Sequence, residues 1–165
     1  MTVTDVRQDP ATHTLTLEAE FDAAPTRAWQ LFADPRQLER WWGPPTYPAT
    51  VTHHDLTPGG RVDYHMTGPA GDEAHGYWEV DEVDPPQRLA FRDGFSNADG
   101  SPNPGLPVSR VVVRLESLAT TRTRVTIESA FPSSEAMEQL LGMGMAEGLR
   151  EAVGQIDALL AAPAA

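Results

Sequence analysis

Cysteine and lysine are both absent from this chain of 165 residues. The lack of cysteine excludes disulfide bonds, thiolate metal sites and cysteine nucleophiles. The lack of lysine means that all 12 basic residues are arginine, and 24 acidic residues bring the formal net charge to −12. A chain this acidic is repelled by phosphate groups, so we expect no nucleic-acid partner and no binding to anionic membranes.

Long hydrophobic runs are lacking as well. No apolar stretch approaches the roughly 18 residues that a membrane-spanning helix needs. The polar N-terminus also lacks the apolar region of a signal peptide. We therefore expect a cytoplasmic protein without membrane insertion, built as a single domain over residues 1–165 with a core from about 13 to 160.

Hydrophobic periodicity predicts the order of the secondary structure elements. Apolar residues alternate from His13 to Phe21, as in a half-buried strand, and two short helices follow between Pro25 and Gly43. The period is two again from Tyr47 to Phe131, and a helical pattern runs from about Ser134 to Leu160. A strand, two helices, a run of strands and one long helix predict an α+β fold with helices on one face of an antiparallel sheet.

Three motifs mark the boundaries of these elements. Residues 41–44 read Trp-Trp-Gly-Pro, residues 55–61 contain Thr-Pro-Gly-Gly-Arg, and residues 82–89 contain Asp-Pro-Pro. In this order they resemble the bacterial proteins similar to the heat-shock ATPase activator (the AHSA-type family), within the START-like (SRPBCC) superfamily. The resemblance implies a helix-grip fold, in which a curved antiparallel sheet wraps around a long C-terminal α-helix with a cavity between them. We expect six or seven strands in that sheet.

The wall of the implied cavity is rich in aromatic residues and methionine. Relatives commonly carry tryptophan at the position of Met145, and the flexible methionine leaves a roomier wall. Trp41 and Trp42 point about 100° apart on a helix, so we expect Trp41 in the core and Trp42 at the cavity entrance. The glycines and prolines from Asp93 to Pro107 predict a long loop, and its residues Phe95 and Leu106 are expected to close the mouth. The predicted pocket residues are Trp42, His53, Tyr64, Met66, Trp78, Phe91, Phe95, Leu141, Met145 and Leu149.

Four glycines lie inside the predicted C-terminal helix, at 142, 144, 148 and 154. Each costs roughly 1 kcal/mol relative to alanine in a helix interior. Three interpretations account for them: the helix backbone approaches the sheet closely, the glycines leave room for a ligand, or they are chance substitutions. Their spacing is not the dinucleotide fingerprint, which excludes a Rossmann site.

Few polar groups are candidates for chemistry. Strand parity places His53 and Glu82 on inward faces, where they serve a structural role, contact a ligand, or form an acid/base pair across the cavity. Together with Tyr64 they are weak catalytic candidates. At most one histidine is expected to point inward, so the sequence predicts no metal site, and it predicts no cofactor.

These features predict a protein that binds a small apolar or aromatic molecule, with no catalysis evident. An alternative from the same superfamily is an enzyme of the polyketide cyclase or dehydratase kind that uses polar residues of the cavity. A lower alternative is a chaperone-associated stress-response factor, suggested by the family's name. The first two differ in whether His53, Glu82 and Tyr64 converge on one void. We expect a monomer or a homodimer.

Overall fold

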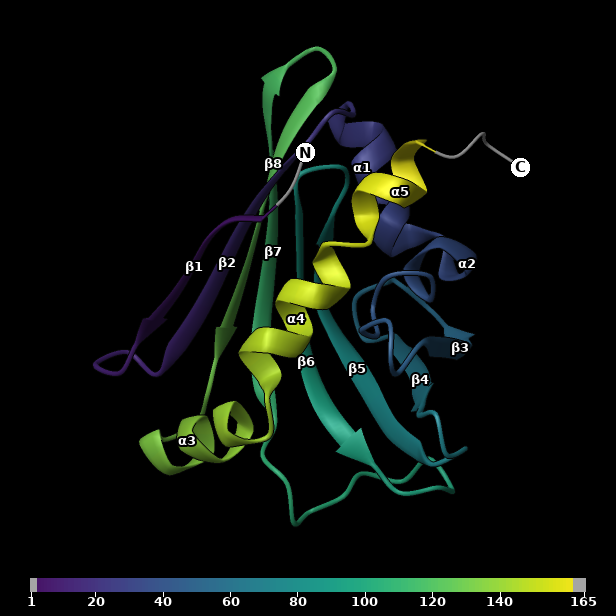
Figure 1. Ribbon diagram of the computed structural model, residues 1–165, viewed down its shortest axis with the longest axis vertical. Helices are drawn as coiled ribbons and strands as arrows, with labels where there is room; N and C mark the ends of the chain where they lie inside the picture. Colours follow the sequence, from purple (N-terminus) through teal and green to yellow (C-terminus); the bar gives the residue numbers. More distant parts are fainter. Residues whose placement is uncertain (1–2, 162–165) are drawn as a thin grey trace.

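The computed structural model describes residues 3–161, and its central feature is one antiparallel sheet of eight strands. The strands follow the order β1-β2-β8-β7-β6-β5-β4-β3 across the sheet (Figure 1). Their bounds are β1 Val3–Asp9, β2 Thr14–Phe21, β3 Ala49–His54, β4 Arg61–Thr67, β5 Glu73–Asp84, β6 Arg88–Ser96, β7 Ser109–Ala119 and β8 Arg122–Ala130.

The strand count exceeds the expected six or seven because β1 precedes the predicted core. Val3 and Val6 are the only large apolar residues of β1, and its burial follows no clean alternation. The strand pairs with β2 alone, at the edge of the sheet, and its register shifts between Val3 and Asp5. Backbone hydrogen bonds rather than a hydrophobic face therefore define this strand, and periodicity cannot detect it.

One face of the sheet is apolar and the other is polar. In β2, residues Leu15, Leu17, Ala19 and Phe21 are fully buried, and the residues between them are partly exposed. β8 shows the same alternation, which is how antiparallel sheets present one face to the core and one to water. The alternation predicted from His13 to Phe21 is confirmed.

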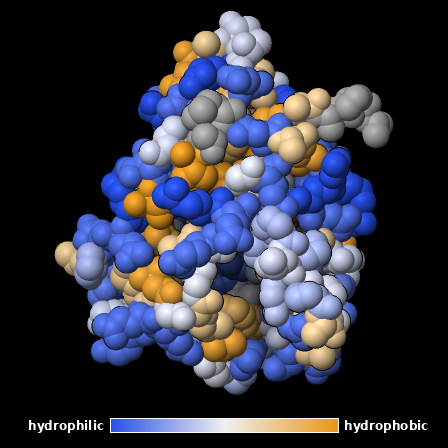
Figure 2. All heavy atoms as spheres, in the orientation of Figure 1, coloured by the Kyte–Doolittle hydropathy of each residue, from blue (hydrophilic) through white to orange (hydrophobic). Residues whose placement is uncertain are grey.

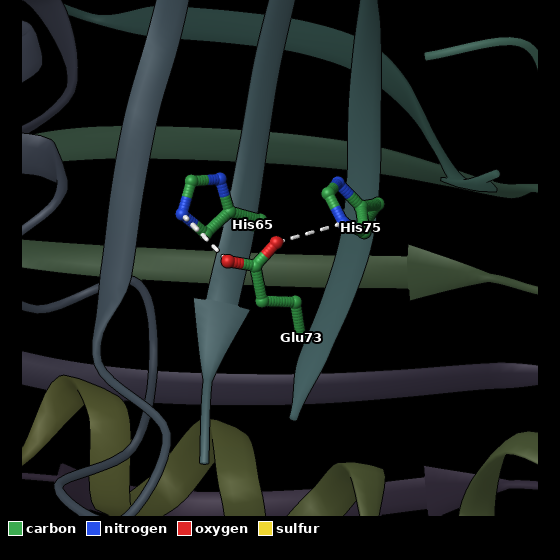
Figure 3. A group of neighbouring side chains, drawn as sticks. All are labelled: His65, Glu73 and His75. Carbon is green, nitrogen blue, oxygen red and sulfur yellow. Dashed lines mark ion pairs between the residues drawn. The ribbon is translucent and has the colours of Figure 1, made fainter. Parts of the chain in front are cut away.

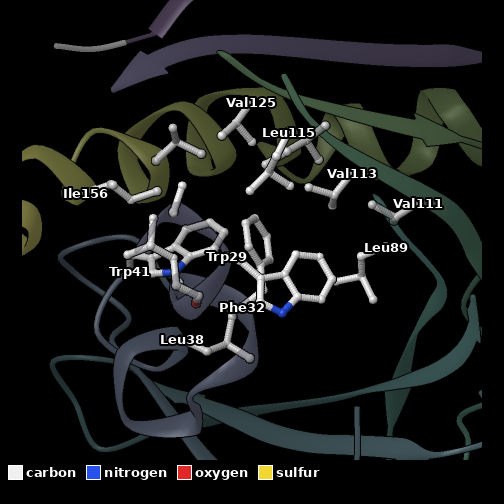
Figure 4. Packing of buried hydrophobic residues seen from close by; sticks show 14 of the residues in the cluster. Trp29, Phe32, Leu38, Trp41, Leu89, Val111, Val113, Leu115, Val125 and Ile156 are labelled. Atoms are coloured by element: carbon white, nitrogen blue, oxygen red, sulfur yellow. Dashed lines mark hydrogen bonds between the residues drawn. The ribbon is translucent and has the colours of Figure 1, made fainter. Parts of the chain in front are cut away.

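Two short helices, α1 (Pro25–Ala33) and α2 (Pro35–Leu38), cover the buried face next to β7, β8 and β3. Trp41 follows them and is fully buried; its indole N–H donates to the carbonyl of Leu31 at 2.9 Å. Its ring meets Phe32 edge to face, with centroids 5.1 Å apart (Figure 4). This aromatic packing anchors the segment that leads into Trp42.

The C-terminal helical region is divided into α3 (Ser134–Gly142), α4 (Met145–Val153) and α5 (Ile156–Ala161). The prediction of one uninterrupted helix from Ser134 to Leu160 was therefore wrong in its continuity. Gly144 adopts the left-handed conformation with φ of 88°, which costs glycine little and ends α3. Figure 1 shows α4 crossing in front of the sheet, and α4 contacts β1 and β2.

The architecture confirms the predicted fold class, an α+β fold in which a curved antiparallel sheet holds C-terminal helices against one face. Within residues 3–161, none of the helices is both long and apolar enough to cross a membrane.

Candidate ligand pocket

A pocket of about 270 Å³ lies between the sheet and the junction of α3 with α4. In the orientation of Figure 1, Figure 2 shows a hollow near the middle of this face with apolar side chains below it. Strands β4, β6, β7 and β8 supply one wall, and α3 and α4 supply the other. The lining residues are Trp42, Pro44, Tyr64, Met66, Asp93, Phe95, Ser109, Val111, Ile127, Ser129, Leu140, Met143, Gly144, Met145, Gly148 and Leu149.

The helical wall owes its open space to glycine. A Cβ built on Gly142, Gly144 or Gly148 would meet no heavy atom within 4 Å. The interpretation that the helix backbone approaches the sheet closely is therefore wrong for these three residues. Gly144 and Gly148 line the pocket, so the missing side chains add to its volume.

The polar wall is a pair of side chains from β4 and β6. The hydroxyl of Tyr64 donates to Oδ1 of Asp93 across 2.8 Å. Both residues line the pocket and are half-buried, and the atoms packed around their side chains limit contact with water. A carboxyl group beside an apolar space is poorly solvated, which disfavours its charged form.

Burial raises the pKa of Asp93 to about 7, although the hydrogen bond from Tyr64 opposes that rise. Burial also raises the pKa of Tyr64 well above its ordinary value, and the charge of Asp93 adds to the effect. The indole N–H of Trp42 is near enough to the Tyr64 oxygen to favour the ionised form slightly, but lies outside hydrogen-bonding geometry. At neutral pH, Asp93 is thus present both as acid and as carboxylate, while Tyr64 stays protonated.

Trp42 forms the boundary between pocket and core. Its ring is edge-on to Tyr64, with centroids 6.0 Å apart, and to Trp78, with centroids 4.9 Å apart. Among the described residues its indole N–H has no hydrogen-bond partner. Trp41, by contrast, is fully buried in the core. The two adjacent tryptophans therefore occupy different environments, with Trp42 on the pocket side.

Trp78 and Phe91 do not line the pocket, contrary to expectation. Their rings stack at 3.9 Å, and both are almost fully buried in the layer behind Trp42. Leu141 also lies outside the pocket lining and packs against the smaller hydrophobic cluster that includes Leu15 and Phe131. Six of the ten predicted pocket residues do line it, namely Trp42, Tyr64, Met66, Phe95, Met145 and Leu149. Leu106, expected beside Phe95 at the mouth, does not.

His53 and Glu82 do not face inward, and the expectation that they do was wrong. β3 has a register shift between Val51 and His53, and β5 has one between Val80 and Glu82. A bulge inserts one residue and reverses the faces of the residues after it. His53 is consequently exposed, and Glu82 is exposed and paired with Arg88 at 2.8 Å.

Of the three weak catalytic candidates, only Tyr64 reaches the pocket. His54 rather than His53 turns toward the interior, where its Nε2 lies 3.0 Å from the carbonyl oxygen of Phe32. A convergence of His53, Glu82 and Tyr64 is therefore absent from the described structure.

Sequence reasoning missed Asp93, because the glycines and prolines after it suggested a loop from Asp93 to Pro107. β6 instead continues to Ser96, which places Asp93 on the inward face of a strand. The alternation of Phe91, Asp93 and Phe95 was the signal that identifies it. Ser109 and Ser129, both buried and both lining the pocket, were missed as well.

A curved antiparallel sheet that grips C-terminal helices over a pocket defines a START-like protein of the helix-grip class. The family model described as Activator of Hsp90 ATPase homolog 1-like protein matches residues 22–161, and the chain belongs to this family. The resemblance stated from the three sequence motifs is thereby confirmed.

Solved structures similar to this chain support the same assignment. Protein Ms6760 from Mycobacterium smegmatis is 52% identical, with a TM-score of 0.89 and 99% of each chain covered. A protein from Arthrobacter aurescens is 48% identical, with a TM-score of 0.94 and coverage of 99% of this chain and 94% of that one. A protein from Staphylococcus epidermidis, 23% identical over 97% and 93% of the two chains, shares the fold with a TM-score of 0.79. The comparison with curated proteins gives no match.

Proposed function

We propose that the protein binds a small apolar or aromatic molecule that carries one hydrogen-bonding group. The observation that carries this proposal is a mostly apolar pocket whose wall carries a hydrogen-bonded polar pair, Tyr64 and Asp93. Ligand sites combine an apolar lining with a few placed polar groups, and the polar groups fix the orientation of the ligand.

The size of the pocket limits the ligand. Its volume of about 270 Å³ lies just below the roughly 300 Å³ at which ordinary ligand pockets begin. A molecule of about one or two rings suits this space. Met66, Met143 and Met145 line it, and methionine side chains adapt to ligands of different outline.

Asp93 supports recognition of either kind of polar group. As a carboxylic acid it donates to a ketone or ester oxygen, and as a carboxylate it accepts from a phenol or an amine. Because its pKa is about 7, both forms are accessible at neutral pH. A phenolic ligand should therefore bind more tightly above that pH and a ketone more tightly below it.

A fluorescence titration tests the proposal. A neutral, environment-sensitive naphthalene dye should bind with one-to-one stoichiometry, and 2-naphthol should displace it. Asp93→Asn and Tyr64→Phe should change the affinity for 2-naphthol more than that for the dye, which lacks a donor. Glu82→Gln, on the exposed surface, should change neither. Absence of saturable dye binding by the folded protein would refute the proposal.

A second candidate function is acid/base catalysis of the cyclase or dehydratase kind, favoured by the pKa of Asp93 near neutrality. In a β-hydroxy ketone, the carboxylate would take the proton from the carbon between carbonyl and hydroxyl. The electrons of that C–H bond would first be held as an enolate, which either takes a proton back or forms the C=C bond as the C–O bond breaks. The carboxylic acid would then return the proton to the departing hydroxide as water.

The proposed acid/base catalysis can be tested separately. Incubation with a small β-hydroxy ketone in D₂O should yield deuterium in the recovered ketone and an enone product. Asp93→Asn should abolish both while retaining dye binding. If the dye binds but neither exchange nor elimination exceeds that in buffer, the protein is a binder without this activity.

A further inference from the structure

On the outer face of the sheet, opposite the pocket, three side chains with metal-binding atoms converge. His65 on β4 and His75 on β5 are direct cross-strand partners, with ring centroids 5.5 Å apart. Glu73, two residues before His75, lies on the same face of β5 because side chains alternate along a strand. Figure 3 shows its carboxylate between the two imidazole rings.

The distances describe an assembled group of donors. Glu73 Oε1 lies 3.2 Å from His75 Nε2, and Glu73 Oε2 lies 4.0 Å from His65 Nε2. One donor atom from each residue falls within 4.8 Å of the others. The histidine side chains are only 22% and 23% exposed, so both rings are held by their surroundings.

We propose that His65, Glu73 and His75 form a binding site for a divalent first-row transition metal ion, with zinc as the expected occupant. Two imidazoles and one carboxylate are a donor set that zinc uses when three protein ligands leave a fourth position open. Zinc bonds of about 2.0–2.2 Å at tetrahedral angles place donor atoms about 3.3–3.6 Å apart. Rotation of the long glutamate side chain and small ring movements close the remaining gap without shifting either strand.

The surroundings favour a cation. The two histidines share the wall of a recess of about 440 Å³ with Asp63 and Asp99, so water can reach the fourth position. Arg61 lines the same recess, but its charge is balanced by Asp63, to which its Nε donates at 2.7 Å, and its Nη2 donates to the Gly100 carbonyl oxygen at 2.7 Å, so Asp99 is the carboxylate left to attract a metal ion there. The net charge of −12 also raises the local concentration of divalent cations.

This proposal runs against the sequence prediction of no metal site, which depended on at most one histidine facing inward. Cross-strand register, not sequence spacing, brings His65 opposite His75. The next pair along the same ladder is Tyr64 with Gly76, on the pocket face. A metal ion at His65 and His75 would therefore tie β4 to β5 directly behind the polar wall of the pocket.

Titration calorimetry of the metal-free full chain with zinc chloride tests the proposal. We expect one zinc ion per chain, and with cobalt(II) the visible absorption bands of tetrahedral coordination. His65→Gln and His75→Gln should each weaken zinc binding by at least about 10- to 100-fold, the loss that removing even an outer-shell partner causes. Bound zinc should also raise the thermal midpoint of the wild type.

His53→Gln is the matched control, since His53 is exposed on the neighbouring strand β3 and lies outside the group. It should leave zinc affinity and the cobalt spectrum unchanged. Zinc-induced shifts of the imidazole NMR signals, measured on the wild type, should be confined to His65 and His75, and this measurement does not depend on the folding of any variant. No stoichiometric binding, or binding that survives both glutamine variants, would overturn the assignment.

Discussion

Tyr64 occupies space that any side chain at Gly76 would need. The two residues are direct partners across β4 and β5, and a Cβ on Gly76 would stand 2.4 Å from both Cζ and the hydroxyl oxygen of the Tyr64 ring. Glycine at this position therefore lets the phenol lie against β5 and reach Asp93. A backbone feature of one strand thus sets a polar contact between two others.

Gly76→Ala should displace the Tyr64 ring and break its hydrogen bond to Asp93. We expect a loss of about 1–3 kcal/mol in the free energy of unfolding, as for other overpacked sites. The pKa of Asp93 should rise further, because the bond from Tyr64 holds it down. Urea denaturation and an NMR titration of the Asp93 carboxyl carbon measure the two effects.

Tyr64→Phe separates the effect on stability from the effect on the pKa of Asp93. This variant removes the donor but keeps the ring, so it should raise the pKa of Asp93 while costing less stability than Gly76→Ala. If Gly76→Ala leaves the pKa of Asp93 where it is in the wild type, the two residues are not coupled as the geometry indicates.

Asp93→Asn should change how stability depends on pH. The folded protein holds the Asp93 proton more tightly than the unfolded chain does, with a pKa of about 7 against 3.8. Through this group, wild-type stability is fully present below the lower value, falls as pH rises between the two, and is level above about 7. Asparagine stays neutral, so its advantage over the wild type should grow across that window, at about 1.4 kcal/mol for each unit of pKa shift as an upper bound.

Urea denaturation of both proteins at about pH 5 and about pH 8 measures this difference. Asp84→Asn, at an exposed position, is the control and should show no such pH-dependent gain. An Asp93→Asn advantage that is equal at both pH values, or larger at the lower one, would contradict a raised pKa.

Gly148→Ala should stabilise the protein and weaken dye binding together. A methyl group there meets no atom within 4 Å, and alanine is favoured over glycine in a helix by up to about 1 kcal/mol. Because Gly148 lines the pocket, the same methyl group should reduce the pocket volume. Gly142→Ala, exposed and outside the pocket lining, should leave the dye affinity unchanged. Equal dye affinity in both variants would show that the dye binds elsewhere.

Met145→Trp distinguishes a true pocket from a packed core. If the space beside Met145 is open, tryptophan fills it, dye binding falls, and stability is kept because filled space regains lost contacts. In a solidly packed interior the same change would cost about 1–3 kcal/mol. Thermal denaturation measures the stability of the variant, and a parallel titration measures its affinity for the dye. A clearly destabilised variant, in a protein that binds no dye, would favour a packed core.

The sequence predicted the fold well where one face of an element is buried. The alternation of β2 and the order of elements carried that prediction, together with the motifs at 41–44, 55–61 and 82–89. The edge strand β1 could not be predicted, since its pairing depends on backbone groups that every sequence has.

The site was harder to predict because the face on which a strand residue lies depends on strand register, which the sequence pattern does not show. Parity holds only until a bulge, and two bulges reversed the faces of His53 and Glu82. Asp93 was missed because its strand was predicted to end before it, whereas β6 continues to Ser96. The pairing of His65 with His75 needed the alignment of β4 with β5, which no local pattern encodes.

The breaks in the C-terminal helical region make α4 a separate helix whose two ends are held differently. At its carboxyl-terminal end, Gln155 donates to the carbonyl of Gly43 at 2.7 Å and so ties the helix to the segment after the tryptophans. At its amino-terminal end, a Cβ on Gly144 would meet no heavy atom within 4 Å, and Met143 is 58% exposed. If α4 moves while its carboxyl-terminal end stays bound through Gln155, Met145 and Gly148 are uncovered first. Backbone hydrogen exchange within α4 should therefore be fastest in its amino-terminal turn. A guest molecule would then pass under that turn while the sheet stays still.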